Sequence, residues 1–204
     1  IEATRLRYAP GAGWRYSNVG YLYVGRLIER VTGLALEDAL VQQVLAPLGL
    51  SAVRLAKART DLVGVCRGAA SAYDPGWVYH GLLVGPLSAA ALFLDRLLAG
   101  QLLPEALLQA MQTARALGGP IPGRSWTSPG YALGLMQGAV DTGVTVCGHT
   151  GVGPGSVVAV YHCADGANTA SCAVFREGAS EGMAEAEVVH RLSEVLKPEK
   201  NDGC

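Results

Sequence analysis

The spacing of apolar residues predicts a helix near the start of the chain. Apolar side chains repeat at helical intervals after the segment Tyr16 to Asn18. They are Leu22, Val24, Leu27, Ile28 and Val31. Gly33 follows where this helix should end, because glycine readily adopts the left-handed conformation that closes a helix.

Three further helices are predicted in the first two thirds of the chain. They cover Glu37 to Leu45, Ser88 to Leu98 and Glu105 to Arg115, and glycine and proline residues separate them. The segment from Ser51 to Gly85 has weak periodicity with Gly and Pro breaks, which is typical of loops.

The pattern changes after a Gly-, Pro- and Ser-rich stretch from Gly118 to Gly130. Four short β-rich runs follow, and then an amphipathic helix from Glu181 to Leu196. The predicted strands are Tyr131 to Gln137, Val144 to Gly148, Ser156 to Cys163 and Ser171 to Arg176. We therefore expect an α+β protein, with a mostly helical subdomain over residues 1–130 and an antiparallel sheet plus terminal helix over residues 131–204.

Composition narrows the functional classes. Half of the 204 residues are hydrophobic, which is enough for a sizeable core, and the net charge of −1 comes without runs of like charge. Binding to nucleic acid is not expected. The most apolar stretch, Gly81 to Leu94, is shorter than a bilayer span and contains Pro86, so no transmembrane segment is expected in this chain.

The five cysteines form no C-x-x-C pair, so neither a metal site nor a cofactor is predicted. They are Cys66, Cys147, Cys163, Cys172 and Cys204, and buried free thiols are the expectation. Cys163 and Cys172 flank a predicted turn at Asp165-Gly166, where a disulfide is the alternative in an oxidising compartment.

The triplet Tyr16-Ser17-Asn18 is the first candidate for catalysis. Residues two apart in an extended segment point the same way, so Tyr16 and Asn18 would face one cleft. A phenol becomes a useful base when a nearby cation lowers its pKa, and Asn18 could hold a substrate amide. The alternative is structural: Tyr16 packs at the helix entrance and Asn18 caps the helix.

The triplet His149-Thr150-Gly151 is the second candidate, and it follows a predicted strand. A peptide substrate could lie along this Gly-rich edge as an added strand, with Thr150 binding a carboxylate and the N–H of Val152 facing an oxyanion. The alternatives are a Gly-rich strand end with a half-exposed histidine, or a nucleophilic pair of Cys147 and His149; a buried thiol is favoured for Cys147.

The wider context carries a family resemblance. The two triplets occur in order with other landmarks, which are Pro10-Gly11, Tyr16 to Tyr21, Gly25, Ile28-Glu29, Gly33, Leu45 to Leu50, Tyr131 to Leu135 and Gly148 to Gly155. This series resembles the serine β-lactamase and D-alanyl-D-alanine carboxypeptidase superfamily, in its class C, penicillin-binding-protein-like branch. The resemblance covers the chain from about Tyr8 onward.

The resemblance implies a β-lactamase/transpeptidase-like fold and assigns roles. Tyr16 would be the general base or proton relay, Asn18 a ligand of the substrate amide, and His149 an electrostatic catalytic group. Thr150, Gly151 and Val152 would bind substrate. A histidine at position 149, where β-lactamases of this branch usually have lysine, favours a carboxypeptidase-like or esterase-like relative.

The nucleophile of that superfamily is missing, because no serine here has a lysine three residues downstream. By the resemblance, the first strands and the nucleophile helix precede Ile1, so an upstream segment or a second chain would carry the serine. The implied function is a serine hydrolase acting through an acyl-enzyme on D-alanyl-D-alanine peptides, β-lactams or small esters, outside the cytoplasm. The alternatives are a non-catalytic remnant or a domain that binds such peptides or β-lactams.

Overall fold

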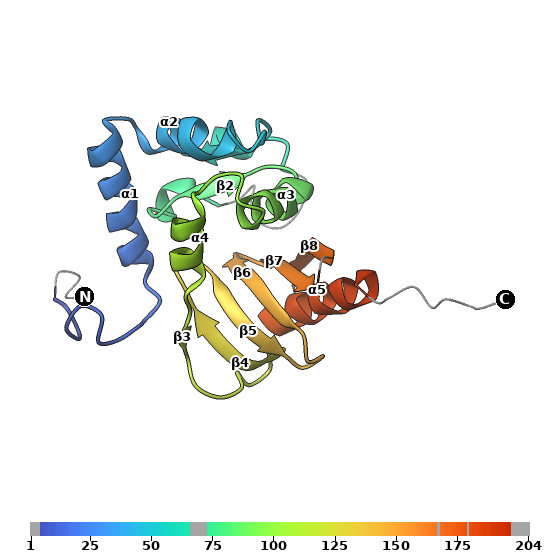
Figure 1. Cartoon of the computed structure of the whole chain (residues 1–204). Helices are drawn as coiled ribbons and strands as arrows, with labels where there is room; N and C mark the ends of the chain where they lie inside the picture. The colour runs from blue at the N-terminus through green and yellow to red at the C-terminus, as the bar shows by residue number, and fades with distance from the viewer. Residues whose placement is uncertain (1–4, 66–72, 167, 179, 197–204) are drawn as a thin grey trace.

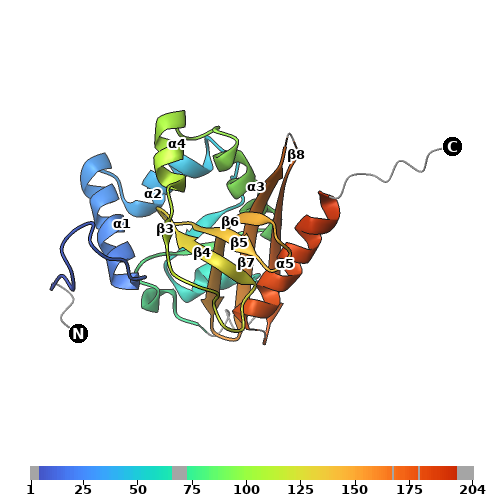
Figure 2. The ribbon, with the colours of Figure 1, turned by 60° about the horizontal axis from the view of Figure 1, so that its bottom comes forward.

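The computed structural model describes residues 5–65, 73–166, 168–178 and 180–196. Figure 1 shows the helices α1 to α4 gathered on one side of an antiparallel sheet, with α5 against the other side. In Figure 2, α1 and α5 stand at opposite sides of the molecule. The α+β arrangement with a closing helix is confirmed.

The first helix, α1 (Asn18–Thr32), forms as its apolar spacing predicts. The hydroxyl of Ser17 accepts a hydrogen bond from the N–H of Gly20, and Gly33 closes the helix in the left-handed region at φ 72°. Ser17, and not Asn18, is therefore the N-cap. The next predicted helix is α2 (Leu36–Leu40), which continues directly as a π-helical turn, η1 (Val41–Leu45).

The segment expected to be loops contains a small sheet. Strands β1 (Arg54–Ala56) and β2 (Leu82–Val84) pair antiparallel, with Leu55 opposite Leu83. The 3-10 turns η2 (Arg59–Leu62) and η4 (Pro75–Trp77) lie between them in the sequence. Strands of three residues are too short to show a period of two, which is why the pattern missed them.

The helices α3 (Leu87–Leu98) and α4 (Glu105–Gln112) agree with the predicted ones, except that the second ends at Gln112 and Arg115 begins a strand. That strand, β3, opens a six-stranded sheet whose neighbours follow the order of the chain, all antiparallel. Its strands are β3 (Arg115–Ala116), β4 (Trp126–Tyr131), β5 (Met136–Val140), β6 (Thr145–Gly153), β7 (Ser156–Asp165) and β8 (Asn168–Glu177).

The predicted strand from Tyr131 to Gln137 is wrong as one continuous strand, because Tyr131 ends β4, Met136 and Gln137 begin β5, and residues 132–135 between them form a turn. Gly134 has a φ of 81°, and the N–H of Ala132 bonds to the carbonyl of Leu135. Ala132 and Leu135 are buried although they lie in the turn, so their apolar character imitated a strand. The strand β4 lies largely in the stretch that its Gly and Pro residues marked as irregular.

The two faces of the sheet are covered by different helices. Helix α5 (Glu181–Val195) packs on β6, β7 and β8 over the larger apolar core, which includes Trp126, Tyr161 and Leu192. Helix α3 packs on the other face through Leu94, which meets Ala132, Leu135 and Cys147. No helix in the described ranges is both long and apolar enough to cross a membrane.

The described cysteines are free thiols. Cys147 and Cys163 are buried, and Cys172 is half-buried. Cys163 pairs with Ala170 and Cys172 with Tyr161 across the β7–β8 ladder, so the two cysteines are diagonal neighbours without a disulfide. Cys66 and Cys204 lie outside the described residues.

Candidate active site

The strand β6 has an open edge where the second triplet begins. Its ladder with β5 ends at Gly148, opposite Met136, whereas its ladder with β7 continues to Gly153. Among the described residues, the part of β6 from His149 to Gly153 therefore has a strand on one side only. Just before this open part, β6 packs closely against β7, and only glycine fits at position 148. A Cβ at Gly148 would meet the carbonyl oxygen of Val160 at 2.0 Å.

His149 is half-buried and makes two hydrogen bonds. Its Nδ1 lies 2.8 Å from the carbonyl oxygen of Thr150, and its Nε2 lies 3.1 Å from the hydroxyl of Tyr131. Burial lowers the pKa of His149, which favours the neutral ring at neutral pH. Because a carbonyl only accepts, Nδ1 carries the proton and Nε2 accepts from Tyr131.

Tyr131 and Tyr21 extend this contact into a chain. The two phenol oxygens are 2.8 Å apart, and since Tyr131 donates to His149 it accepts from Tyr21. Burial, followed by the hydrogen bond to Tyr21, raises the pKa of Tyr131 well above its usual range. The sequence contains both residues in family landmarks, but their contact joins positions far apart in the chain, so the triplets alone did not identify them.

Tyr16 stands beside this chain of hydrogen bonds. Its ring centroid is 6.1 Å from that of His149, 5.6 Å from that of Tyr21 and 6.5 Å from that of Tyr131. Burial, and then the neighbouring Tyr21, raise the pKa of Tyr16. The lowered pKa that a base needs is therefore not produced by the described residues.

The segment that carries Tyr16 is held against the sheet. The guanidinium of Arg115, on β3, donates to the carbonyls of Gly11 at 3.0 Å and Ala12 at 3.1 Å. The ring of Trp14 lies 4.7 Å from that of Tyr131. These contacts bring the first triplet and the second triplet together.

Asn18 is exposed and is the first residue of α1. The extended conformation assumed for the first triplet reaches only to Ser17, at φ −153° and ψ 115°. A role for Asn18 toward a substrate amide thus stays a prediction. Gly151 and Val152 lie exposed on the open part of β6, where a substrate could reach their backbone.

Thr150 does not share a face with His149. Its side chain is buried, and Oγ1 donates to Glu185 Oε1 at 2.7 Å and lies 2.7 Å from the hydroxyl oxygen of Tyr161. Successive side chains of a strand point to opposite faces, so Thr150 points toward α5 while His149 points away from it. In this arrangement Tyr161 and Glu185 occupy the Thr150 hydroxyl, and the expectation that Thr150 binds a substrate carboxylate stays a prediction.

The alternative of a nucleophilic Cys147–His149 pair is not supported. Burial raises the pKa of Cys147 to about 11, which disfavours the thiolate that a Cys–His pair needs. In the part of the chain that the structure describes, no three His, Cys, Asp or Glu side chains meet as metal ligands.

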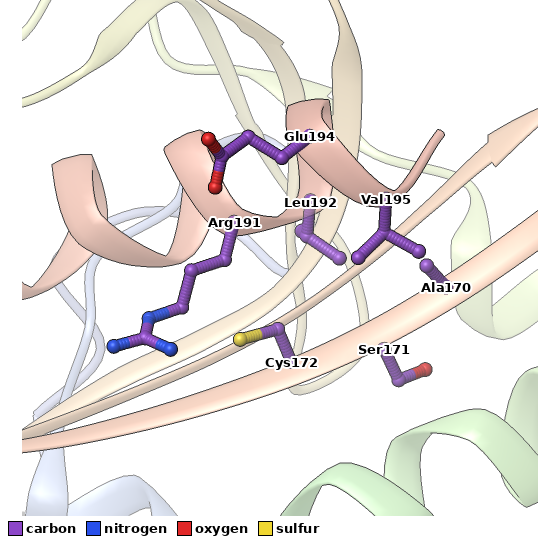
Figure 3. Close-up of a pocket in the computed structure, with 7 residues that line it drawn as sticks. All are labelled: Ala170, Ser171, Cys172, Arg191, Leu192, Glu194 and Val195. Atoms are coloured by element: carbon purple, nitrogen blue, oxygen red, sulfur yellow. The ribbon is translucent and has the colours of Figure 1, made fainter. Parts of the chain in front are cut away.

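A small hollow lies between β8 and the end of α5 (Figure 3), where Cys172 and Arg191 are among the lining residues. It is on the α5 side of the sheet, whereas His149 points to the other side. The hollow is therefore separate from the candidate site.

Comparisons with known proteins agree with the α+β fold. A family model described as Beta-lactamase matches residues 1–174. A D-stereospecific amidohydrolase from Streptomyces sp. superposes with a TM-score of 0.69 at 26% identity, over 91% of this chain and 56% of that one. A D-amino acid amidase from Ochrobactrum anthropi SV3, solved with D-phenylalanine, gives 0.70 at 21% identity, over 94% and 61%.

A penicillin-binding protein homologue from Pyrococcus abyssi gives a TM-score of 0.68 at 21% identity, over 95% of this chain and 45% of its own. An Escherichia coli (strain K12) protein provisionally described as a D-alanyl-D-alanine carboxypeptidase is 39% identical over 51 residues, 25% of this chain and 12% of that protein. The chain thus aligns with 45–61% of these solved structures. With more than half of its length matched by the family model, the chain belongs to the Beta-lactamase family.

Proposed function

We propose that this chain supplies the tyrosine–histidine part of an acyl-transfer site in a serine hydrolase. The substrates would be D-alanyl-D-alanine peptides, D-amino acid amides, β-lactams or small esters. The observation that carries the proposal is the meeting of Tyr16, Tyr131 and His149 beside the open edge of β6. A site of this kind needs proton-exchanging groups next to a strand that can bind an acyl substrate.

The reaction would use a serine from outside the described residues. Its oxygen would attack the substrate carbonyl, its proton would pass to a base, and the leaving amine or alcohol would take a proton before water hydrolyses the ester. The N–H of Val152, on the open edge, would face the developing oxyanion. Tyr16 would serve as base or relay once the lysine of a Ser-x-x-Lys segment stands beside it and lowers its raised pKa.

Two uncovered surfaces favour the presence of such a segment in the whole protein. Helix α1 has no buried residue, and its apolar side chains Val24, Leu27 and Val31 are exposed. The outer edge of β8, a strand of ten residues, has no partner strand among the described residues. Apolar surface and unpaired strand edges of this size are usually covered by another part of the protein or by a partner.

The test uses the protein with a Ser-x-x-Lys segment ahead of residue 1, on the same polypeptide or as a second chain. We expect its intact mass to increase by the mass of penicillin after incubation, and D-phenylalanine amide to be hydrolysed faster than the L form. Tyr16→Phe should reduce the acylation rate by about 100-fold, the scale of a lost proton transfer. Tyr23→Phe is the matched control, because Tyr23 is also half-exposed but its ring contacts Arg26. Failure to acylate with any penicillin, ester or D-amide would contradict the proposal.

The pH dependence should follow His149. Its lowered pKa means that the neutral ring persists at neutral pH and is lost as the pH falls well below the ordinary value of about 6.5. Protonation would remove the acceptor for Tyr131, so activity should fall on the acid side. His149→Gln should abolish this limb, whereas His190→Gln, at an exposed histidine of α5, should leave it in place.

The second candidate is a non-catalytic domain that binds D-alanyl-D-alanine peptides or β-lactams. The raised pKa values of Tyr16 and Tyr131 favour it, because such phenols stay protonated. A protonated phenol can donate a hydrogen bond to a ligand but cannot act as a base. Calorimetry with a D-alanyl-D-alanine peptide would support it if His149→Ala weakened binding and no turnover occurred. Turnover that Tyr16→Phe abolishes would exclude it.

A further inference from the structure

A buried carboxylate lies beneath the candidate site. Glu185, in α5, is 1% exposed and accepts hydrogen bonds from four side chains. Oε1 receives Thr150 Oγ1 at 2.7 Å, Tyr161 hydroxyl at 3.1 Å and Trp126 Nε1 at 3.2 Å, and Oε2 receives Arg124 Nε at 2.8 Å. We call Arg124, Trp126, Thr150, Tyr161 and Glu185 the Glu185 cluster.

The Glu185 cluster joins the sheet to the last helix. Trp126 comes from β4, Thr150 from β6, Tyr161 from β7 and Glu185 from α5. The oxygens of Thr150, Tyr161 and Glu185 lie close to one another in a triangle. Only two hydroxyl protons, one from Thr150 and one from Tyr161, are available for its three contacts. Thr150 is the member that reaches the candidate site, because it adjoins His149 on the same strand.

Packing alone does not explain a charge at this place. The other buried residues of α5 near Glu185 are apolar: Ala184, Val188 and Val189. A buried ion pair is often no more stabilising than apolar side chains of similar volume. Burial acts to raise the pKa of Glu185, but the bonds from Arg124 and Thr150 outweigh it and hold that pKa below its usual value, so Glu185 is a carboxylate. A charged, fully bonded group inside a core fixes orientation more strictly than apolar packing does.

The orientation that this group fixes is that of β6. One side chain of β6 is held on the α5 side by Glu185, and the next, His149, is held on the opposite side by Tyr131. Since the pleat links the directions of neighbouring side chains, a turn of the backbone at Thr150 would also change the direction in which His149 projects. The carbonyl that receives the Nδ1 proton of His149 also belongs to Thr150. The direction of this carbonyl therefore determines which nitrogen of His149 is left to accept from Tyr131.

We propose that Glu185 is a positioning residue: by holding the Thr150 hydroxyl, it sets the backbone of β6 so that His149 keeps Nδ1 protonated and Nε2 directed at Tyr131. This inference deepens the proposed function and rests on it, because His149 matters for turnover only if the site transfers acyl groups. Thr150 then acts from behind the strand and does not touch the substrate through its hydroxyl.

The first measurement is the ¹⁵N NMR signature of His149 in the full protein. We expect the parent to show the Nδ1-protonated tautomer, and Thr150→Val, which keeps the shape but loses the hydroxyl, to show a mixture of tautomers. Thr150→Ser restores the hydroxyl and should restore the parent signature. Glu185→Gln should also give a mixture. Glu187→Gln is its matched control on α5, because Glu187 pairs with Arg176 and Arg191 at the surface.

The second measurement is the acylation rate of the same variants with penicillin. Thr150→Val should lower the maximal rate at least 10-fold with KM within twofold, while Thr150→Ser stays within threefold of the parent. Glu185→Gln leaves Arg124 without its carboxylate and can unfold the protein. If Glu185→Gln does not fold, the result for Thr150→Val decides whether the inference holds. A folded Thr150→Val protein that keeps the parent tautomer overturns the inference. A parent that never acylates overturns the proposed function instead, and the tautomer measurement still decides the role of Glu185.

Discussion

Helices α1 and α5 have the same length, 15 residues, and opposite surroundings. Five residues of α5 are buried, including Glu185, whereas none of α1 is. Both helices start at a serine N-cap and both have an apolar stripe, so their local sequences are similar in kind. The difference teaches that an amphipathic pattern specifies a helix, while its partners decide how much of its apolar face leaves water.

The candidate site combines residues from the well-packed sheet that α5 covers and from the less covered part of the chain around α1. Tyr131 and His149 come from the packed sheet, and Tyr16 and Tyr21 come from the segment and helix at the less covered side. We therefore expect substitutions on the α5 side to affect the stability of the whole chain, and substitutions on the α1 side to act locally.

The largest contrast should come from apolar truncations. Trp126 is 1% exposed in the main core, so Trp126→Ala should reduce the free energy of unfolding by about 3–5 kcal/mol. Val31 of α1 is 76% exposed, and Val31→Ala should change it by no more than about 0.5 kcal/mol. Urea denaturation of the 204-residue chain measures both. Equal effects would mean that α1 is covered in solution, for example by a second copy.

The next effect should come from the charge of Glu185. Its lowered pKa means that the carboxylate stabilises the fold above its ordinary pKa of about 4.3, and that this contribution is lost as the pH falls through the lower, folded value. Glu185→Gln should cost about 2 kcal/mol at neutral pH, the scale of hydrogen bonds to a buried charge. The difference from the parent should shrink in acid. A difference that does not change with pH would show that the charge is not what stabilises.

A smaller effect is expected from the two serine N-caps, which make the same kind of hydrogen bond at the start of α1 and of α5. Ser180 caps α5 by accepting from the N–H of Met183, as Ser17 caps α1 by accepting from Gly20. Ser180→Ala should cost about 1 kcal/mol of unfolding free energy. Ser17→Ala should cost less in global unfolding and appear instead as faster amide exchange in the first turn of α1. The reverse order would contradict the comparison.

The smallest effect on stability should come from Arg115, which holds the segment before Tyr16. Arg115→Gln should change the free energy of unfolding by no more than about 0.5 kcal/mol, because the contact is at the surface. It should nevertheless speed proteolysis between Gly11 and Tyr16. Arg54→Gln, at another exposed arginine that donates to a backbone carbonyl, is the control and should leave that cleavage unchanged.

The local sequence determined the helices and the longer strands of this protein. Apolar spacing and a closing glycine were enough for α1, and alternation over long runs was enough for β7 and β8. It was not enough at Ala132 and Leu135, which are buried by tertiary contacts in a turn, or at the three-residue strand β1. In both cases the deciding interactions come from residues distant in the chain.

For the candidate site, the sequence by itself predicted Tyr16 and His149, because the two short triplets contain residue types that acyl-transfer chemistry needs. Only the tertiary structure decided that Tyr131 and Tyr21 complete the hydrogen-bonded chain and that Thr150 faces α5. Alternation along a strand requires Thr150 and His149 to point in opposite directions, but it does not say which face is the cleft. That choice follows from where α5 and the segment before α1 pack on the sheet, which no local pattern contains.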